Sequence, residues 1–220
     1  MLLDRPMQVV TPTVDGDILA VLARGDVALT PGELQRRMER YSISGIRKAL
    51  IRLTEQGTIT TETRAHATTY QLNRRHLAAD AIVALANQRQ EFITRLSSAL
   101  DNFSPAPGYA ALFGSAARGE MHADSDIDLF LVRPDDIADG LRDSWDDAVA
   151  GLIQDSTAWT GNDTRVLEME RSEVRNALVH GDPVLDSILE DGIRLLGPRS
   201  FWRRVVNETG SKSAGSARAS

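Results

Sequence analysis

The sequence predicts an α+β protein with two domains joined by a helical linker. Three short amphipathic segments and then two β-prone runs occupy residues 14–74, which indicates a small helical domain closed by a hairpin. Residues 75–103 are mostly helical in pattern and form the expected linker, as one long helix or two. Residues 104–206 alternate between strand and helix patterns, which predicts an α/β domain with a small mixed sheet. Residues 207–220 are of low complexity, and we expect a disordered tail.

The composition is that of a globular protein, and it is compatible with a reducing compartment. Of its 220 residues, 42% are hydrophobic and 25% are charged, and there is no cysteine. The lack of cysteine excludes disulfide scaffolds, thiolate zinc sites and cysteine nucleophiles. The first residues lack a basic start followed by a long apolar run, and no apolar stretch approaches the roughly 18 residues of a membrane span. We therefore expect a cytoplasmic protein with no membrane partner.

Charge is distributed unevenly along the chain. Residues 1–76 contain 11 Arg and Lys against 8 Asp and Glu, whereas residues 77–220 contain 14 against 23. The excess is concentrated in residues 42–76, where 6 basic residues face 2 acidic ones. A localised basic segment in an acidic chain is compatible with nucleic-acid binding. Ordinary variation in surface charge gives similar counts, so the charge permits DNA binding without establishing it.

The first two helices of the N-terminal domain have clear boundaries. An apolar stripe predicts a helix that ends at Gly25. The next helix begins with Thr30 as a cap, Pro31 at the first helical position and Glu33 three residues after the cap. This is the arrangement of a capping box, in which side chains satisfy free backbone amides at a helix start.

A third helix and a hairpin complete this domain. The helix opens on Ser42 or Ser44 and closes on Gly57. Residues 58–62 and 68–72 are rich in threonine and other β-prone residues, and a short polar turn lies between them. Helices followed by a two-stranded ribbon are typical of a small nucleic-acid-binding module.

This order, together with the phrase IRKALIRLTEQGTI, resembles the bacterial winged-helix regulator family. In such domains the third helix enters the DNA major groove and the hairpin, or wing, contacts the backbone or the minor groove. The resemblance implies that residues 42–56 form the recognition helix. The alternative is a winged helix that serves only dimerisation or protein contact. The predicted DNA-binding residues are Ser44, Arg47, Lys48 and Arg52 in the helix and Arg64 and His66 in the wing.

In the C-terminal domain, the β-prone run YAALF leads directly into Gly114 and Ser115, and a short helix follows. Glycine allows the backbone to turn tightly and to approach a ligand closely. Ser115 lies at the helix start, where free amides and the helix dipole favour an anion. The turn is therefore a candidate phosphate-binding site.

Two aspartates begin the next predicted strand. Asp126 and Asp128 differ by two positions and so point to the same face, whereas Phe130 and Val132 continue that face as apolar residues. Two like charges at the start of a strand that becomes buried need a compensating cation. Carboxylates suit Mg²⁺ or Mn²⁺, and a phosphate turn beside a metal-binding pair is what in-line phosphoryl transfer requires.

The phrase GSAARGEMHADSDIDLFLV resembles the signature of the DNA polymerase beta-like nucleotidyltransferase superfamily. Its minimal nucleotidyltransferase branch shows G-S-x-x-R-G before S-D-x-D-L, and the resemblance covers about residues 105–132. It implies that the G-S turn binds the triphosphate and that the aspartates hold two metal ions. The residues that carry the implied nucleotide contacts are Gly114, Ser115, Arg118 and Ser125.

The family usually supplies a third carboxylate from a later strand, as a metal ligand or as a base for the acceptor. The expected strand is residues 164–170, where Glu168 and Glu170 share a face. We assign Glu168 as the third metal ligand and catalytic carboxylate, because Glu170 ends the strand beside Arg171. An aspartate is more usual at this place, and the alternative that both glutamates are solvated strand residues stays open.

These features predict a metal-dependent nucleotidyltransferase that moves an NMP from an NTP, with ATP as the expected co-substrate, to a hydroxyl of a protein, a tRNA or a small molecule. The alternative is a transcription regulator whose nucleotidyltransferase fold only binds a nucleotide. The resemblance is compatible with a toxin–antitoxin role and with an antibiotic-modifying role, and nothing in the sequence selects between them. The winged helix adds DNA as an expected partner and a homodimer as one expected state.

Overall fold

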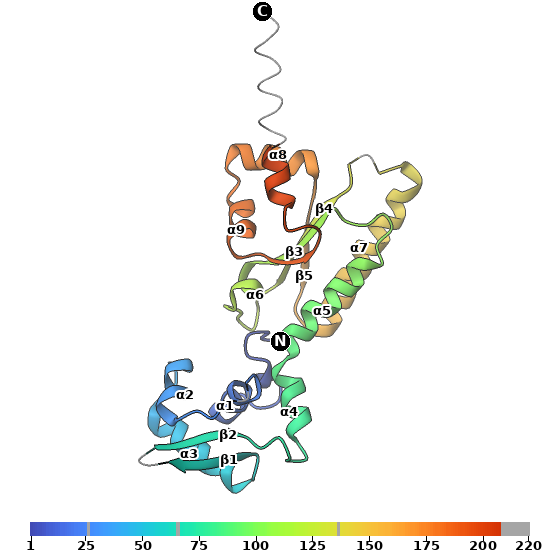
Figure 1. The fold of residues 1–220 in the computed structure, drawn as a ribbon. Coiled ribbons are helices and arrows are strands. Elements are labelled where there is room, and N and C mark those ends of the chain that lie inside the picture. The colour runs from blue at the N-terminus through green and yellow to red at the C-terminus, as the bar shows by residue number, and fades with distance from the viewer. Residues whose placement is uncertain (26, 65–66, 136, 208–220) are drawn as a thin grey trace, which may run out of the picture. The chain divides into compact units, whose positions relative to one another are not determined.

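A computed structural model describes residues 1–25, 27–64, 67–135 and 137–207. The chain divides into two compact units, Met1–Glu91 and Phe92–Ser220 (Figure 1). The division falls within the helix α5 (Gln88–Asp101), inside the predicted linker 75–103. The predicted tail, residues 207–220, lies outside the described residues apart from its first. Helices and two small sheets together confirm a mixed α+β fold.

The first unit is built from short helices and one hairpin. Its elements in order are η1 (Pro6–Val9), α1 (Val14–Ala23), α2 (Pro31–Arg37), α3 (Ile43–Glu55), β1 (Ile59–Arg64), β2 (Ala67–Leu72) and α4 (Ala79–Ala86). The predicted capping box at Thr30 is present, because Thr30 Oγ1 accepts a hydrogen bond from Glu33 N and the Glu33 carboxylate accepts one from Thr30 N. The cap of α3 is Ser42, whose Oγ accepts from Gly45 N at 3.2 Å.

The hairpin of this unit is joined by a third extended segment. β1 and β2 are antiparallel, with Ile59 opposite Leu72. Leu29, between α1 and α2, forms an antiparallel bridge to Tyr70, and each backbone N donates to the other residue's O at 2.8 Å. The order along the chain is therefore α1, the Leu29 bridge, α2, α3 and the hairpin. The buried residues of α3 pack in the apolar core of this unit.

A buried carboxylate ties three segments of this unit together. Asp17, in α1, is 5% exposed, and its Oδ2 accepts hydrogen bonds from three side chains. These are Arg5 Nη2 at 3.0 Å, Arg40 Nη2 at 2.7 Å and Tyr41 Oη at 2.6 Å. Because a buried charge requires such partners, Asp17 fixes the N-terminal segment and the α2–α3 turn onto α1.

The second unit contains a four-stranded mixed sheet among the described residues. After α5 come β3 (Tyr109–Phe113), α6 (Gly114–Arg118), β4 (Ile127–Arg133), α7 (Asp139–Thr160), β5 (Thr164–Glu170), α8 (Arg171–His180), α9 (Pro183–Asp191) and β6 (Ile193–Leu196), and residues 201–207 are helical. The strand order is β5-β4-β3-β6, with β3 antiparallel to both neighbours and β4 parallel to β5. This confirms the predicted small mixed sheet.

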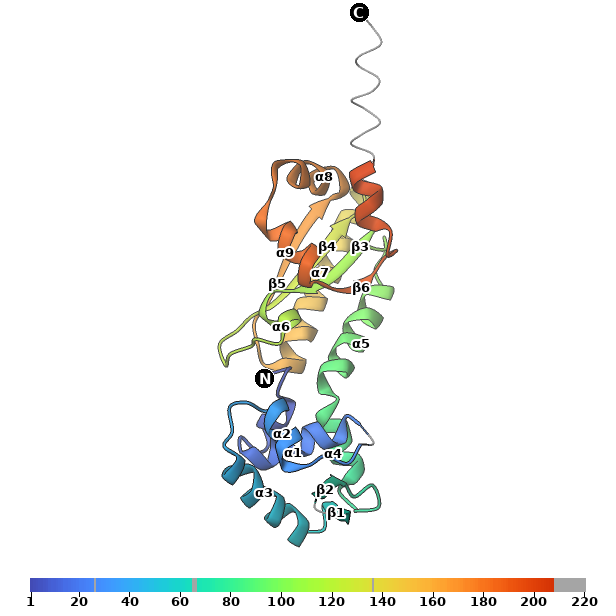
Figure 2. The same cartoon turned by 60° about the vertical axis from the view of Figure 1, so that its left-hand side comes forward.

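Each face of this sheet is covered by helices, as Figures 1 and 2 show. On one face, Tyr109, Ala111, Phe130 and Val132 pack with apolar residues of α8, α9 and the 201–207 helix. The other face turns toward α7, where Thr164 Oγ1 donates to Ser156 Oγ at 2.8 Å. The two faces alternate along β4, so each residue of that strand belongs to one helical layer or the other.

No helix among the residues described is both long and apolar enough to cross a lipid bilayer.

Candidate active site

The site begins where β3 ends. Phe113 is extended, and α6 starts at Gly114 with a φ of +69°. A Cβ at Gly114 would collide with Oδ2 of Asp128, which lies on the neighbouring strand. Glycine is therefore required for two reasons, its left-handed backbone and the close approach of a carboxylate.

The helix that follows is short and turns back at once. Ser115 is half-buried in the first turn of α6, and its carbonyl accepts hydrogen bonds from the backbone N of Gly119 and Glu120. Gly119 has a φ of +72° and ends the helix. The start of this turn lies beside Asp128, because Phe113 pairs with Asp128 and Gly114 closely approaches its carboxylate.

The acid pair lies directly at the start of β4. Asp126 precedes the strand and Asp128 is its second residue, paired with Phe113 of β3 and with Arg165 of β5. Burial raises the pKa of Asp128, and the charge of Asp126 raises it further, while Arg165 and Arg118 act in the opposite direction. The carboxylates are thus close enough to repel each other, as the sequence predicts for a pair that awaits a cation.

A cation that sequence reasoning did not single out lies against this pair. Arg165 Nη2 contacts Asp126 Oδ2 at 2.9 Å, and the arginine side chain is 74% exposed whereas that of Asp126 is 24% exposed. Arg165 shares its sheet face with Leu167 and Met169, as Asp128 does with Phe130 and Val132. In both strands, one charged residue is followed on the same face by apolar residues. This repeated pattern is the sequence feature that could have identified Arg165.

The predicted third ligand, Glu168, requires correction. It pairs with Leu131 and so projects from the opposite face of the sheet from Asp128. There its Oε2 accepts a hydrogen bond from Nε1 of the buried Trp145 at 2.6 Å. The structure does not bring Glu168 to the acid pair, because parallel pairing of β4 and β5 gives the shared face to Arg165 instead.

Glu170 is also engaged elsewhere. Its Oε1 accepts from Arg133 Nη2 at 2.7 Å, and its side chain and that of Glu173 form a capping box at the start of α8. Glu170 is thus held by Arg133 and by the start of α8.

The loop before the acid pair is anchored by a buried asparagine. Ser125 Oγ accepts from His122 N at 2.8 Å, and Ser125 O accepts from Asn162 Nδ2 at 2.8 Å. Asn162 is 4% exposed, and the next residue, Asp163, accepts at its carbonyl from Ile127 N. Ser125 therefore shapes the loop, and Asn162 is a positioning residue that sequence reasoning missed, although it directly follows the helix-ending Gly161.

Arg118 ends α6 near the acid pair. Its Nε donates to Glu120 Oε2 at 2.8 Å. The pKa of Arg118 is raised chiefly by this hydrogen bond, with further contributions from the charges of Asp191 and Asp128. The role of Arg118 in nucleotide binding stays a prediction.

The donor set of the site fits a divalent cation that shares its coordination with a substrate. In the described ranges, no group of three or more His, Asp or Glu side chains could hold a metal ion together. Mg²⁺ commonly uses one or two carboxylates together with substrate phosphates. Asp126 and Asp128 supply two carboxylates beside the Gly114–Ser115 turn, which matches that mode of binding.

The predicted DNA-binding residues of the first unit are placed differently from one another. Ser44, Arg47 and Lys48 are exposed on α3. Arg52 is held in a bidentate contact with Asp15 of α1, at 2.6 Å and 3.1 Å. Arg64 ends β1, and His66 lies outside the described residues.

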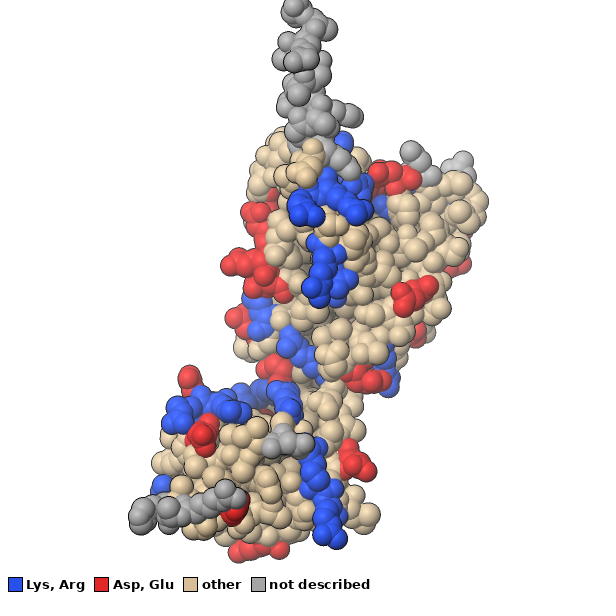
Figure 3. Space-filling view, viewed as in Figure 1, with Lys and Arg blue, Asp and Glu red and all other residues tan. Residues whose placement is uncertain are grey.

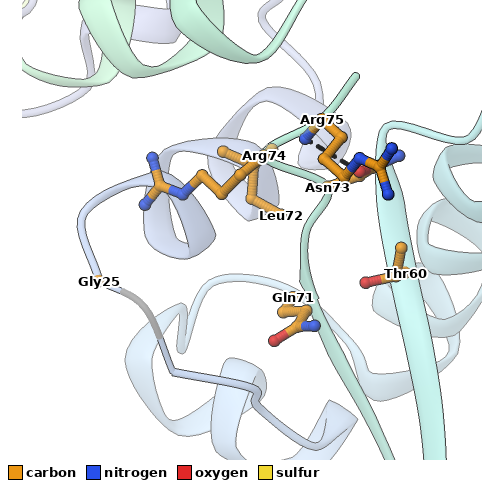
Figure 4. A pocket seen from close by; sticks show the side chains of 7 residues that line it. All are labelled: Gly25, Thr60, Gln71, Leu72, Asn73, Arg74 and Arg75. Atoms are coloured by element: carbon orange, nitrogen blue, oxygen red, sulfur yellow. Dashed lines mark hydrogen bonds between the residues drawn. The ribbon is translucent and has the colours of Figure 1, made fainter.

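Among the described residues of this unit, hollows lie beside the hairpin. One, of about 480 Å³, runs between α3 and the hairpin and is lined by Thr30, Pro31, Arg47, Ile51, Ala67, Thr68 and Tyr70. Another, of about 360 Å³, is shown in Figure 4 and is lined by Gly25, Thr60, Gln71, Leu72, Asn73, Arg74 and Arg75. In this second hollow Arg74 and Arg75 extend in opposite directions, and Arg74 Nη2 donates to Ala23 O. Of the predicted DNA-binding residues, Arg47 lines the first hollow and none lines the second.

Basic side chains do not form one continuous patch on the visible face of the first unit. Figure 3 shows Lys and Arg there in separate groups, with acidic side chains at several places on the same face.

Comparison with known proteins gives the class of the second unit. Residues 93–176 match the family described as nucleotidyltransferase domain. A solved toxin–antitoxin structure with AMP-PNP shares 20% identity, with a TM-score of 0.36, and a mutant of the toxin–antitoxin MntA–HpeT shares 18%, also at 0.36. Each comparison covers 56% of this chain and 90% of the other. No curated protein matches the sequence significantly. The family match thus identifies residues 93–176 as similar to nucleotidyltransferase domains, and both the Gly114–Ser115 turn and the acid pair lie inside the matched residues.

Proposed function

We propose that this chain uses a divalent metal to transfer an NMP from an NTP, with ATP as the first candidate, to a hydroxyl acceptor. The observation that carries the proposal is the contact between the Gly114 turn and the Asp128 carboxylate. It puts a candidate phosphate-binding backbone and a candidate metal ligand side by side. The match of residues 93–176 to nucleotidyltransferase domains supports the same reaction class.

Each residue then has a defined task. Asp126 and Asp128 would hold Mg²⁺ or Mn²⁺, the Gly114–Ser115 turn would bind the terminal phosphates, and Arg118 would offset their charge. The metal, when bound, supplies electrostatic stabilisation of the phosphoryl group under attack. The acceptor oxygen forms a bond to the α-phosphorus, the bond to pyrophosphate breaks, and the hydroxyl proton passes to water. Ser125 keeps the loop before Asp126 in place through its backbone and hydroxyl contacts.

Labelled NTPs, Mg²⁺ and cell extract test this proposal with the full chain. We expect label transfer to an acceptor that falls on the order of 1000-fold in the Asp126→Ala/Asp128→Ala variant, because several kcal/mol of stabilisation are lost. Glu168→Gln is the matched control, since this carboxylate lies on the opposite face and glutamine still accepts from Trp145; it should retain transfer. Tight NTP binding with no transfer to any acceptor would instead support a regulator that only binds a nucleotide.

We also propose that the first unit is a winged helix that binds DNA through α3. The order of α1, the Leu29 bridge, α2, α3 and the hairpin supports this assignment. Ser44, Arg47 and Lys48 are exposed on α3, where a recognition helix would face a major groove. The ion pair of Arg52 with Asp15 makes its predicted contribution to DNA binding weaker than theirs.

Gel-shift titration at several salt concentrations tests DNA binding. Arg47→Ala/Lys48→Ala should weaken binding and lower the slope of log affinity against log salt by about 2, as expected for two lost phosphate contacts. Arg142→Ala, an exposed arginine on α7 of the second unit, is the control and should leave the slope unchanged. Equal binding by both variants would favour a protein-contact role for this unit.

A further inference from the structure

Arg165 occupies the position on β5 that faces the acid pair. In the parallel register, Arg165 is the direct neighbour of Asp128, and its guanidinium lies 2.9 Å from Asp126 Oδ2. The next residues on its face, Leu167 and Met169, are packed against the apolar cluster of this layer. Arg165 is thus the residue through which β5 enters the candidate site.

The charges of the site explain why a cation lies there. Asp126 and Asp128 repel each other, and the guanidinium of Arg118, at the end of α6, is hydrogen bonded to Glu120. Arg165 is therefore a cation in direct contact with the pair, through Asp126. Its side chain is 74% exposed, so it can leave Asp126 without the large cost of moving a buried charge.

We propose that Arg165 is a resident counter-ion that competes with a divalent cation for Asp126 and moves to the nucleotide phosphates when metal and nucleotide bind together. This inference rests on the proposed function. A divalent cation at Asp126 repels the guanidinium, while the polyphosphate that arrives with it offers acceptors that suit arginine's planar set of donors. As a consequence, metal alone binds weakly and metal with nucleotide binds strongly.

Binding measurements on the full chain separate this role from a structural one. Mn²⁺ binding is followed by electron paramagnetic resonance without nucleotide, and binding of α,β-methylene-ATP is followed by calorimetry with saturating Mn²⁺. Arg165→Ala should tighten Mn²⁺ alone up to about fivefold, as the loss of an exposed competing ion pair allows. The same variant should weaken the nucleotide analogue by about tenfold or more, because a charged hydrogen bond to phosphate is lost. Opposite signs in one variant are the signature of the proposal.

A second variant tests the position of residue 165 itself. Arg165→Asp places a third carboxylate beside the pair and should tighten Mn²⁺ alone by about tenfold or more, since carboxylate number sets the affinity of oxygen sites. Arg142→Ala, the exposed arginine on α7, should change neither measurement. If Arg165→Ala leaves both affinities unchanged or shifts them in the same direction, or if Arg165→Asp fails to tighten Mn²⁺, the proposal is overturned.

Failure of the underlying function looks different. In that case the unmodified chain binds neither Mn²⁺ nor the analogue, or Asp126→Ala/Asp128→Ala binds them as well as the unmodified chain does. Binding that depends on the acid pair but not on Arg165 keeps the proposed function and rejects the role of Arg165.

Discussion

Gly114 is the residue whose replacement best tests the geometry of the site. Gly114→Ala imposes a left-handed backbone on a residue with a Cβ, at a cost of about 1 kcal/mol, and pushes that Cβ into Asp128 Oδ2. Because Asp128 must move, we expect affinity for α,β-methylene-ATP with Mn²⁺ to fall at least about tenfold, as calorimetry would show.

The matched control for this change is Gly181→Ala. Gly181 ends α8 with a φ of +68°, and a Cβ there would meet nothing within 4 Å. It carries the backbone penalty without the collision, so it should lower the unfolding temperature while nucleotide affinity stays the same. Equal affinities in the two variants would show that the contact between Gly114 and Asp128 plays no part in binding.

At the level of the elements, periodicity in the sequence was sufficient to predict which side chains share a face, wherever a strand or helix has one apolar side. The two-residue spacing of Asp126 and Asp128 correctly predicted a shared face that continues into the buried Phe130 and Val132. The capping residues of α2 likewise predicted its start, because a cap depends on neighbours three residues apart.

The prediction of Glu168 as the third ligand was wrong because it depended on how β5 pairs with β4. No local sequence pattern specifies that pairing. Strands β4 and β5 are joined through α7, and their pairing decides which residues of β5 face Asp128. Periodicity defines two faces of β5 but does not say which one meets the acid pair. On β5, Arg165 is followed on the same face by Leu167 and Met169. This pattern repeats that of Asp128, Phe130 and Val132 on β4, and it indicates more directly which face of β5 meets the acid pair.

The role of Asn162 in holding the loop before β4 could not be predicted from the sequence, for a related reason. Its hydrogen bonds join the end of α7 to the loop before β4, through Ser125 O and Thr160 Oγ1. These partners are 37 and 2 residues away along the chain. A buried polar residue in a loop cannot be separated from an exposed one until the fold places its long-range partner.

At the scale of the whole molecule, the two units have separate apolar cores. One is built around α1, α3 and the hairpin, and the other lies between the sheet and α8, α9 and the 201–207 helix. Contacts cluster within Met1–Glu91 and within Phe92–Ser220. Unfolding is therefore expected to deviate from a single two-state transition, because multi-domain chains commonly do.

A substitution in the first unit should accordingly change its stability without changing nucleotide binding. Asp17→Asn leaves Arg5 and Arg40 without their shared carboxylate. We expect a loss of about 2–3 kcal/mol, below the usual range for a broken buried pair because Arg40 is partly exposed. Asp15→Asn, which removes the exposed pair with Arg52, is the control and should cost less than about 1 kcal/mol. Circular dichroism melts of the full chain, fitted with a separate transition for the first unit, measure both losses, and calorimetry with Mn²⁺ and α,β-methylene-ATP measures binding. Equal losses in the two variants, or nucleotide affinity that falls with Asp17→Asn, would contradict this independence.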